Sequence, residues 1–330
     1  MSTSLRIATF NLENLDDVDG EEPTLAKRIA VMQPQLIRLR ADVLCLQEVN
    51  GQEHPPQPRD LSALGKLLQQ TPYAGYQMAH TLTANGDAYD KRNLVVLSKY
   101  GITDTKQIRG EGLRPSYRKV TAIPPEPNAE EITWERPILH VKVALGNNRT
   151  LHLCNVHLKS KIPTKIEGRM IDQYTWSSVA GWAEGYFISS MKRVGQALGL
   201  RILIDEIFDQ ADSAGEEALV AVCGDFNADI DSVTVSAIRG PVEETGNPGL
   251  SHRVIVPCEL SVPESSRYSL FHLGKGLMLD HILASRSLLT FYRGAEIHNE
   301  NLPDESGAFR TDVKFPESDH APVVAEFILP

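Results

Sequence analysis

Short apolar runs separated by polar loops recur along the whole chain and predict a protein rich in β-strands. A run of four to eight apolar residues between turn signals is typical of a strand buried on both faces. Runs of this kind predict strands at residues 5–10, 42–46, 76–79, 94–98, 138–145, 150–157, 219–223, 268–272, 278–283 and 322–328.

Helical periodicity is confined to a few segments. Residues 25–40 and 61–70 are predicted helices, and Pro34 is expected to bend or interrupt the first of them. A long helix is predicted from an apolar stripe with spacings of 4, 3, 4 and 4, formed by Phe187, Met191, Val194, Leu198 and Ile202. Residues 159–185 lack a clear period and are expected to form an irregular insertion.

The ratio of strands to helices decides the fold class. Many strands and few helices do not fit a doubly wound parallel sheet, whereas two packed sheets with helices outside fit well. The chain has no internal repeat, low-complexity tract or Gly/Ser linker. We therefore expect a single α/β domain over residues 1–330.

Composition and charge narrow the classes of partner. The chain has 330 residues, of which 42% are hydrophobic and 23% charged, so a large core can form. Lys and Arg number 33 against 43 Asp and Glu, which gives a formal net charge of −10. This charge argues against non-specific coating of nucleic acid or anionic membrane. It does not exclude an enzyme that handles phosphate through a bound metal ion.

The N-terminal residues, the lengths of the apolar runs and the cysteines indicate the cellular compartment. The first residues lack a secretory signal, and no run approaches the roughly 18 apolar residues needed to span a bilayer. Cys45, Cys154 and Cys223 lie in apolar runs, and none of the four cysteines has the spacing of a zinc site. We expect a soluble cytoplasmic protein with reduced thiols, without a transmembrane segment, and we infer no obligate protein partner.

Carboxylate, amide and imidazole side chains occur where apolar runs end. They are Asn11, Glu48, His157, Asp225, Asn227, Asp280, Asp319 and His320. Strand ends are where such folds collect functional groups. Carboxylates that converge raise one another's pKa unless a cation compensates, and oxygen ligands of this kind favour one or two Mg²⁺ or Mn²⁺ ions.

The same residues can divide the work of phosphoester hydrolysis. Asp225 and Asn227 could orient or deprotonate an attacking water, and His157 and His320 could stabilise the phosphoryl oxygens. Asp280 could hold His320 in its tautomer and orientation. Each motif alone is weak, because an Asp-His pair is usually a solvated turn and GDFN can be a turn with a capping Asn. Six such elements in order outweigh that interpretation.

The ordered series ATFNLEN, LQE, NVHLKS, CGDFN, LDHIL and SDHAPV resembles the endonuclease/exonuclease/phosphatase superfamily. That superfamily includes pancreatic-type DNases, exonuclease III, abasic-site endonucleases, deadenylases, neutral sphingomyelinases and inositol polyphosphate 5-phosphatases. The resemblance runs from residue 7 to residue 324. It implies a four-layer α/β/β/α sandwich in which two packed mixed sheets are flanked by helices.

The resemblance also implies a role for each residue at a motif position. Asn11, Glu48 and Asp319 match metal-binding positions, whereas Asp225 and Asn227 match the pair that positions the nucleophilic water and the phosphate. Asp280 matches the carboxylate that orients the terminal histidine. His157 and His320 match histidines that contact the phosphate.

Substrate recognition is less well marked. Candidate substrate-binding residues are Lys159, Lys161, Arg136, Tyr117 and Arg118. Aromatic residues of the insertion could stack nucleic-acid bases or could simply pack its core. Glu13 follows the motif pattern, but a capping or loop role explains it equally well. His152 is expected to be a buried, hydrogen-bonded histidine, and His281 is expected to point away from Asp280.

Three functions remain open. The favoured one is a metal-dependent phosphodiesterase, a nuclease or nucleotide phosphodiesterase, using in-line attack of a water activated by Asp225. The alternative is a phosphatase or a phospholipase related to sphingomyelinases, against which the lack of an apolar membrane-docking run counts mildly. A scaffold with a decayed site is least favoured, because every motif position holds a competent residue. The acidic segment 16–22 is expected near the opening of the active site, where its negative charge would repel a long duplex and favour short substrates.

Overall fold

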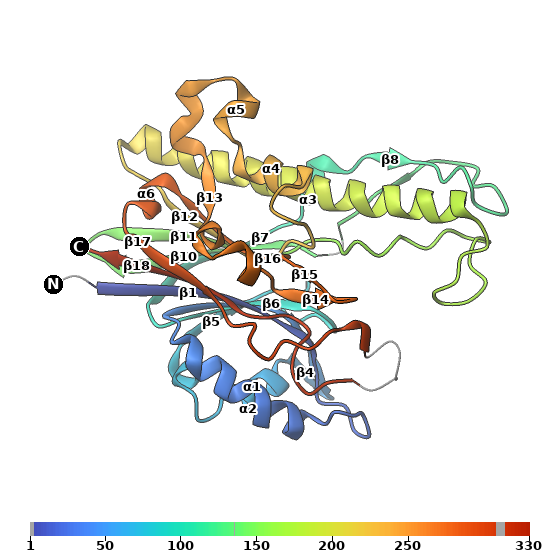
Figure 1. Ribbon diagram of the computed structural model, residues 1–330, viewed down its shortest axis with the longest axis horizontal. Coiled ribbons are helices and arrows are strands. Elements are labelled where there is room, and N and C mark those ends of the chain that lie inside the picture. The colour runs from blue at the N-terminus through green and yellow to red at the C-terminus, as the bar shows by residue number, and fades with distance from the viewer. Residues whose placement is uncertain (1–2, 135, 308–313) are drawn as a thin grey trace.

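The computed structural model describes residues 3–134, 136–307 and 314–330 and consists of four layers. Figure 1 shows two β-sheets packed face to face, with α1 and α2 outside one sheet and α3 and α4 outside the other. The layered fold predicted from the sequence is therefore confirmed. The two sheets matter for function because each contributes strand ends to the same edge of the sandwich.

The first sheet contains both ends of the described chain. Its strand order is β17-β18-β1-β2-β6-β5. The strands are β1 (Thr3–Leu15), β2 (Val43–Val49), β5 (Gln77–His80), β6 (Asn93–Ser98), β17 (Tyr292–Ile297) and β18 (Val323–Leu329). β1 and β2 are parallel, whereas β18 runs antiparallel to β1 with Thr3 opposite Leu329. The last strand is thus a central strand, hydrogen-bonded to the first.

The second sheet has the order β13-β16-β12-β11-β10-β7. Its strands are β7 (Gly101–Ile108), β10 (Ile138–Gly146), β11 (Arg149–His157), β12 (Leu219–Asp225), β13 (Ile255–Pro257) and β16 (Asp280–Ser285). β11 and β12 are parallel, and the other pairings in this sheet are antiparallel. The sequence did not predict β7 or β17, because their alternate residues are polar and partly exposed at the sheet edges.

Apolar side chains fill the space between the sheets and the space beneath the helices. Ile7 and Cys45 from the first sheet share a fully buried cluster with Leu153 and Cys223 from the second. The helices α1 (Leu25–Leu39) and α2 (Ser62–Leu68) cover the first sheet, and α3 (Val179–Ala214) and α4 (Val233–Arg239) cover the second. The central strands are therefore apolar on both faces, as in the sequence. All four cysteines are buried and free.

The sequence predicted a bend or an interruption near Pro34, and the helix α1 continues through this residue without interruption. Proline removes one backbone hydrogen bond, to the carbonyl of Ala30. Both Ala30 and Pro34 are exposed, so water can satisfy that carbonyl. Thr24 caps the helix by accepting a hydrogen bond from the N–H of Lys27.

The helix α3 corrects two further expectations. It begins at Val179, inside the segment 159–185 that was expected to be irregular. The stripe predicted from apolar spacing lies largely outward: Leu198 is 47% exposed and Ile202 is 41% exposed. Ile204 and Leu200 are among the residues that pack on the second sheet. Because the helix is apolar on both sides, periodicity alone could not identify its buried face.

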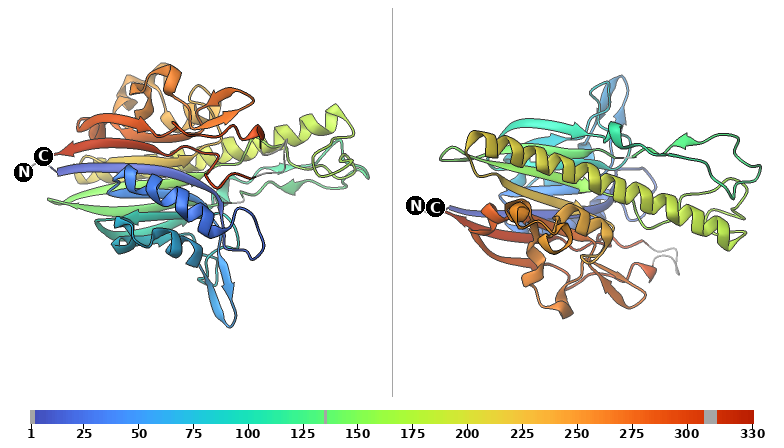
Figure 2. Two further views of the ribbon diagram at one scale, coloured as in Figure 1. Left: turned by 60° about the horizontal axis from the view of Figure 1, so that its bottom comes forward. Right: turned by 90° about the horizontal axis from the view of Figure 1, so that it is seen from above.

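An arm extends beyond the ends of the sheets, on the side away from the chain termini (Figure 2). We define it as residues 110–134, residues 159–178 and the N-terminal half of α3. Glu184 of α3 joins its parts by accepting hydrogen bonds from the hydroxyl of Tyr117 and from the backbone N–H groups of Val120 and Thr121. The ring of Tyr117 also packs on Phe187.

Short elements complete the structure. Three small hairpins pair β3 (Gln52–His54) with β4 (Gln57–Asp60), β8 (Ser116–Tyr117) with β9 (Glu130–Glu131), and β14 (Leu270–His272) with β15 (Lys275–Leu277). The short helices are α5 (Val242–Thr245) and α6 (Arg286–Leu289). Within the described ranges, no helix combines the length and apolar character needed to cross a membrane.

Candidate active site

Strand pairing brings the predicted site residues together at one edge of the sandwich. His157 ends β11, Asp225 ends β12 and Asp280 begins β16. Asp225 lies opposite both His157 and Asp280 in the two ladders, so the three residues are adjacent on neighbouring strands. Asn11 and Glu48 approach from β1 and β2 of the first sheet. The site therefore straddles both sheets.

Asp225 is buried and surrounded by hydrogen-bond donors. Its Oδ1 accepts the N–H of Asn227 at 2.8 Å, and its Oδ2 accepts the side-chain amides of Asn227 at 2.9 Å and Asn11 at 3.2 Å. Nε2 of His157 lies 3.3 Å from the same Oδ2. Burial favours the neutral acid, but the hydrogen bond from His157 and the charge of His320 outweigh it and lower the pKa of Asp225. The carboxylate therefore stays ionised.

The backbone around Asp225 takes conformations that place its neighbours. Asn227 has a φ of 49°, in the left-handed region that Asn tolerates better than most residues. This conformation turns the side chain back to Asp225, and the amide Nδ2 also donates to the carbonyl oxygen of Leu158 at 3.1 Å. Asn227 thus joins the ends of β11 and β12.

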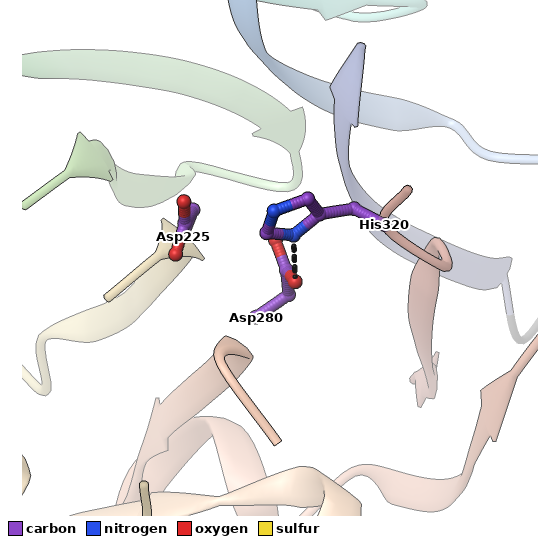
Figure 3. Close-up of side chains that lie close together, drawn as sticks. All are labelled: Asp225, Asp280 and His320. Atoms are coloured by element: carbon purple, nitrogen blue, oxygen red, sulfur yellow. Dashed lines mark hydrogen bonds and ion pairs between the residues drawn. The ribbon is translucent and has the colours of Figure 1, made fainter. Parts of the chain in front are cut away.

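Asp280 and His320 form a buried pair beside Asp225 (Figure 3). Nδ1 of His320 lies 2.6 Å from Oδ2 of Asp280, which is fully buried. Burial opposes the charged imidazole, but Asp280, Asp319 and Asp225 together raise the pKa of His320 well above its usual range. Burial also raises the pKa of Asp280, against the effect of His320. The pair holds the imidazole in one orientation, with Nε2 directed away from Asp280.

His157 and Glu48 form a second contact between the sheets. Nε2 of His157 lies 3.4 Å from Oε1 of Glu48, and the other carboxylate oxygen accepts the N–H of Asn14. Burial would raise the pKa of Glu48, but His157, Arg92 and Arg136 reverse that effect and lower it. Nδ1 of His157 is buried and finds no hydrogen-bond partner among the described residues.

A group of carboxylates beside this contact has the character of a cation site. The buried Oδ1 of Asp319 has no hydrogen-bond partner in the part of the chain that the structure describes, and it lies 3.9 Å from Nε2 of His320. Burial raises the pKa of Asp319 well above its usual range, and although His320 opposes this shift, Glu13 and Glu48 add to it. A divalent cation would compensate this concentration of acidic oxygens. The residues present therefore fit such an ion.

Asn11 occupies the centre of this arrangement but is already hydrogen-bonded. Its Oδ1 accepts the N–H of Glu13 at 2.9 Å, while its Nδ2 donates to Asp225. The backbone oxygen of Asn11 accepts the hydroxyl of Ser318, and the same hydroxyl accepts the N–H of His320. Asn11 thus connects the end of β1 to Asp225 and to the loop that carries His320.

Two residues that contribute to the site were not predicted to do so. Arg28 of α1 is buried and donates to the backbone oxygens of Leu12, Glu13 and Asn14. Glu13, whose place in the sequence a capping role explained equally well, accepts the N–H of Asp319 at 3.1 Å. An arginine on the otherwise apolar buried face of α1 was the only signal for Arg28 in the sequence.

The candidate substrate-binding residues fall into two groups. Arg136 donates to the backbone oxygens of His157 and Leu158, so it lies beside the site. Lys159 donates from Nζ to Ser160 and Ile162, and Lys161 pairs with Asp229 at 2.8 Å. These three residues border the site. Tyr117 and Arg118 lie on the arm instead, at β8 and directly after it.

The structure resembles several solved structures at low sequence identity. TDP2 of D. rerio, humanized by 14 mutations, has 15% identity, covers 98% of each chain and has a TM-score of 0.57. The 3′ phosphatase NExo from Neisseria, bound to product DNA hairpin, has 16% identity, covers 98% of this chain and 99% of its own, and has a TM-score of 0.54. An AP endonuclease from Archaeoglobus fulgidus has 16% identity, covers 98% and 99%, and has a TM-score of 0.53. At this identity the likeness shows the fold alone.

The sequence itself places the chain in a family. The family model described as the Endonuclease/Exonuclease/phosphatase family matches residues 8–320. No curated protein matches the sequence. The matched range includes every motif residue from Asn11 to His320. The chain therefore belongs to the endonuclease/exonuclease/phosphatase family, whose members are divalent-metal-dependent hydrolytic phosphoesterases.

Proposed function

We propose that this protein is a Mg²⁺- or Mn²⁺-dependent phosphodiesterase, a nuclease or nucleotide phosphodiesterase. One observation carries the proposal: Asp225, Asp280 and His320 present ligand atoms within 4.8 Å of one another at the joint edge of two sheets. An ionised acid thus lies close to a cationic imidazole at this edge. This pairing provides for the attacking water on one side and for the phosphoryl oxygens on the other.

The proposed ion is assigned to Glu48 and Asp319, with Glu13 and Asn11 beside them. The set of Asp225, Asp280 and His320 is less suitable, because Nδ1 of His320 is already bonded to Asp280 and Asp225 accepts several donors. Oδ1 of Asp319 is buried without a hydrogen-bond partner in the described ranges, as is Oδ1 of Asp280, but Asp319 also feels the further carboxylates of Glu13 and Glu48. When bound, the ion supplies positive charge to the phosphate oxygens and lowers the pKa of water.

The residues of the chain then divide the reaction between them. Asp225 and Asn227 hold the attacking water in line, and Asp225 takes its proton as the new oxygen–phosphorus bond forms. The opposite bond from phosphorus to the leaving alcohol oxygen breaks in the same step, and that oxygen takes a proton from solvent water. The low pKa of Asp225 makes it a weak base in the resting site, so orientation is the larger part of its role. His320, charged and fixed by Asp280, donates from Nε2 to a phosphoryl oxygen. His157 supports the same phosphate from β11.

Support for a nucleotide substrate comes from the surroundings of the site and from the solved relatives. Arg136, Lys159 and Lys161 border the site on one side, where flanking phosphates would lie. The NExo structure contains a product DNA hairpin. On the other side, Asp16, Glu21 and Glu22 line a hollow of about 320 Å³ next to Glu13. Lys91, Arg92 and Lys314 line the same hollow, so its lining carries both signs of charge and does not by itself select the length of the substrate.

The proposal predicts metal-dependent hydrolysis that Asp225→Ala and His320→Ala abolish. Each substitution is expected to lower kcat by about 100- to 10,000-fold, because each removes a group acting on the transition state. The measurement is hydrolysis of bis-p-nitrophenyl phosphate, plasmid DNA and single-stranded RNA with Mg²⁺, with Mn²⁺ and with EDTA.

The matched control is Asp231→Ala, an exposed aspartate close to Asp225 in the sequence, which should retain wild-type activity. Thermal unfolding of each variant shows whether it is folded. Turnover that persists in EDTA, or in a folded Asp225→Ala variant, would contradict the proposal.

A second candidate, a phospholipase related to sphingomyelinases, is favoured by the surface of the arm. The arm exposes the apolar side chains of Ile162, Ile171, Val179 and Trp182, which could enter a lipid surface. The apolar docking surface that the sequence lacks as a continuous run is thus assembled from separate segments. Release of phosphocholine from sphingomyelin vesicles, faster than cleavage of every nucleic-acid substrate, would favour this candidate.

A further inference from the structure

A buried ionic pair lies directly behind the site and takes no part in the chemistry described above. Glu259, on the short 3₁₀ helix Cys258–Ser261, and His281 of β16 are both fully buried. Nδ1 of His281 lies 2.5 Å from Oε1 of Glu259. Nε2 of His281 lies 2.8 Å from the carbonyl oxygen of Ala228. Burying two charged groups carries a desolvation penalty, so the pair is weak evidence of stabilisation and a positional role has to be considered.

The partners of His281 define its protonation state. Both neighbours are acceptors, a carboxylate on one side and a carbonyl oxygen on the other, so both ring nitrogens carry hydrogen. Burial opposes this charged form, but Glu259 outweighs it and raises the pKa of His281. The edge-to-face ring of Phe226, with its centroid 5.0 Å away, covers the imidazole.

His281 lies where two parts of the active site meet. Ala228 directly follows Asn227, whose amide bonds to Asp225. On the other side, His281 directly follows Asp280, and successive strand residues point to opposite faces. Asp280 therefore reaches His320 while His281 reaches Ala228. The hydrogen bond from the His281 imidazole thus connects the loop of Asn227 to the strand of Asp280.

A backbone hydrogen bond lies beside this contact and joins the same two segments, the loop of Asn227 and the start of β16. The N–H of Phe226 donates to the carbonyl oxygen of Leu279 at 2.8 Å. That hydrogen bond restrains Phe226, which precedes Asn227, whereas the hydrogen bond from His281 restrains Ala228, which follows it. Together they restrain the turn that gives Asn227 its left-handed conformation.

We propose that Glu259 and His281 form a positioning pair that sets the separation between Asn227 with Asp225 and Asp280 with His320. The proposal rests on the proposed phosphoester hydrolysis. Neither residue touches the substrate, since both are enclosed by the protein. Glu259 keeps His281 doubly protonated, and His281 donates a hydrogen bond to the carbonyl oxygen of Ala228. Asn227 and Asp225 therefore keep a fixed distance from Asp280 and His320. Loss of the pair therefore raises the free energy of the transition state more than it weakens substrate binding.

The test compares Glu259→Gln, Glu259→Asp, His281→Gln and His281→Leu in the intact protein, with bis-p-nitrophenyl phosphate and saturating Mg²⁺. Glu259→Gln and His281→Leu should lower kcat by about 10- to 100-fold and leave KM within about twofold, as removal of a supporting hydrogen bond does at other sites. His281→Gln keeps an N–H for Ala228 and should recover part of that loss. Glu259→Asp keeps the charge but withdraws it by one methylene, so its kcat should be intermediate.

Glu264→Gln, an exposed glutamate of the same segment, is the matched control and should behave as wild type. Circular dichroism and thermal unfolding report the folded fraction, and kcat is corrected for it. Folded variants of Glu259 and His281 with unchanged kcat would overturn the proposal, as would equal losses in His281→Gln and His281→Leu. Absence of hydrolysis in the wild-type protein would instead overturn the proposed function, so the two failures are distinguishable.

Discussion

At the scale of single residues, His140 and His152 show how burial can make a protein sensitive to acid. They lie diagonally across β10 and β11, where His140 is opposite Cys154 and His152 is opposite Lys142, with Nε2 of His140 3.2 Å from Nδ1 of His152. The hydrogen bond expected for His152 is thus confirmed, whereas the side chain is only partly buried. Burial lowers the pKa of each imidazole to about 4, and in His140 the charge of His152 adds to the shift. The pair is therefore neutral in the folded protein at pH 7.

Replacing both histidines should reduce the loss of stability in acid. The folded protein protonates the rings near pH 4, whereas the unfolded chain does so near pH 6.5, so the unfolded state binds more protons between these values. The stability of the neutral pair is present above pH 6.5 and is lost as the pH falls towards 4. We expect the free energy of unfolding of the wild type to fall by roughly 2 kcal/mol more than that of His140→Gln/His152→Gln between pH 7 and pH 5.

Urea unfolding at the two pH values measures this difference. His54→Gln, at an exposed histidine of β3, is the control and should retain the full acid sensitivity of the wild type. Equal losses in the wild type and the double variant would contradict the prediction.

The sequence predicted the residues that meet at the site better than the contacts they make there. Asn11, Glu48, His157, Asp225, Asp280 and His320 could be found because six motif elements follow one another in order at the ends of apolar runs, although a turn or a cap could explain each element alone. The support of Arg28 and the pairing of Glu259 with His281 could not be found in this way. These contacts join segments far apart in the chain, and no local pattern records which buried polar groups meet.

At the scale of elements, the close pairing of β11 and β12 depends on Gly224. This residue has a φ of 142°, and a Cβ atom there would lie 1.9 Å from the carbonyl oxygen of Val156. Only glycine fits this backbone conformation and this approach. Gly224 therefore lets β12 deliver Asp225 to a position opposite His157.

Gly224→Ala should lower the free energy of unfolding by roughly 3 kcal/mol, because the strands must separate or the backbone must change conformation. The measurement is denaturant unfolding, followed by far-UV circular dichroism. Gly101→Ala is the matched control, since a Cβ at that strand residue meets no atom within 4 Å. A loss below about 0.5 kcal/mol in Gly224→Ala would show that the strands accommodate the methyl group.

The elements also show where prediction from sequence stops. Strands buried on both faces, such as β2 and β12, were predicted because their sequences are continuously apolar. The edge strands β7 and β17 were missed because half-exposed strands carry polar residues. In α3, two apolar stripes compete, and only packing on the second sheet decides between them.

At the scale of the whole molecule, Asn155 connects the two sheets through hydrogen bonds. Its side-chain amide in β11 donates to the carbonyl oxygens of Leu46 in β2 and Val95 in β6, and its Oδ1 accepts the amide of Gln47 at 2.7 Å. The ladder between β2 and β6 shifts register between Leu46 and Val49, so β2 is irregular just before Glu48. The fully buried Asn155 satisfies polar groups at this irregularity.

Asn155→Leu should therefore lower both stability and activity. We expect the free energy of unfolding to fall by roughly 3 kcal/mol, because buried carbonyl and amide groups lose their partner. Activity per folded molecule should fall as well, since Glu48 follows the irregularity. Denaturant unfolding and kcat measure the two effects, with Gln210→Leu on the exposed side of α3 as control. Unchanged stability would show that water or a neighbouring group replaces the amide.

The position of β18 has a consequence for the order in which the site is made. Ribosomes build the chain from β1 onwards, so Asn11, Glu48 and Asp225 emerge well before residues 318–329 are added. The first sheet has a gap beside β1 until β18 fills it, and Asp319 with His320 arrives only in the loop that precedes that strand. A nascent chain thus carries Asp225 before it carries His320. The proposed site is therefore one of the last parts of the fold to be completed.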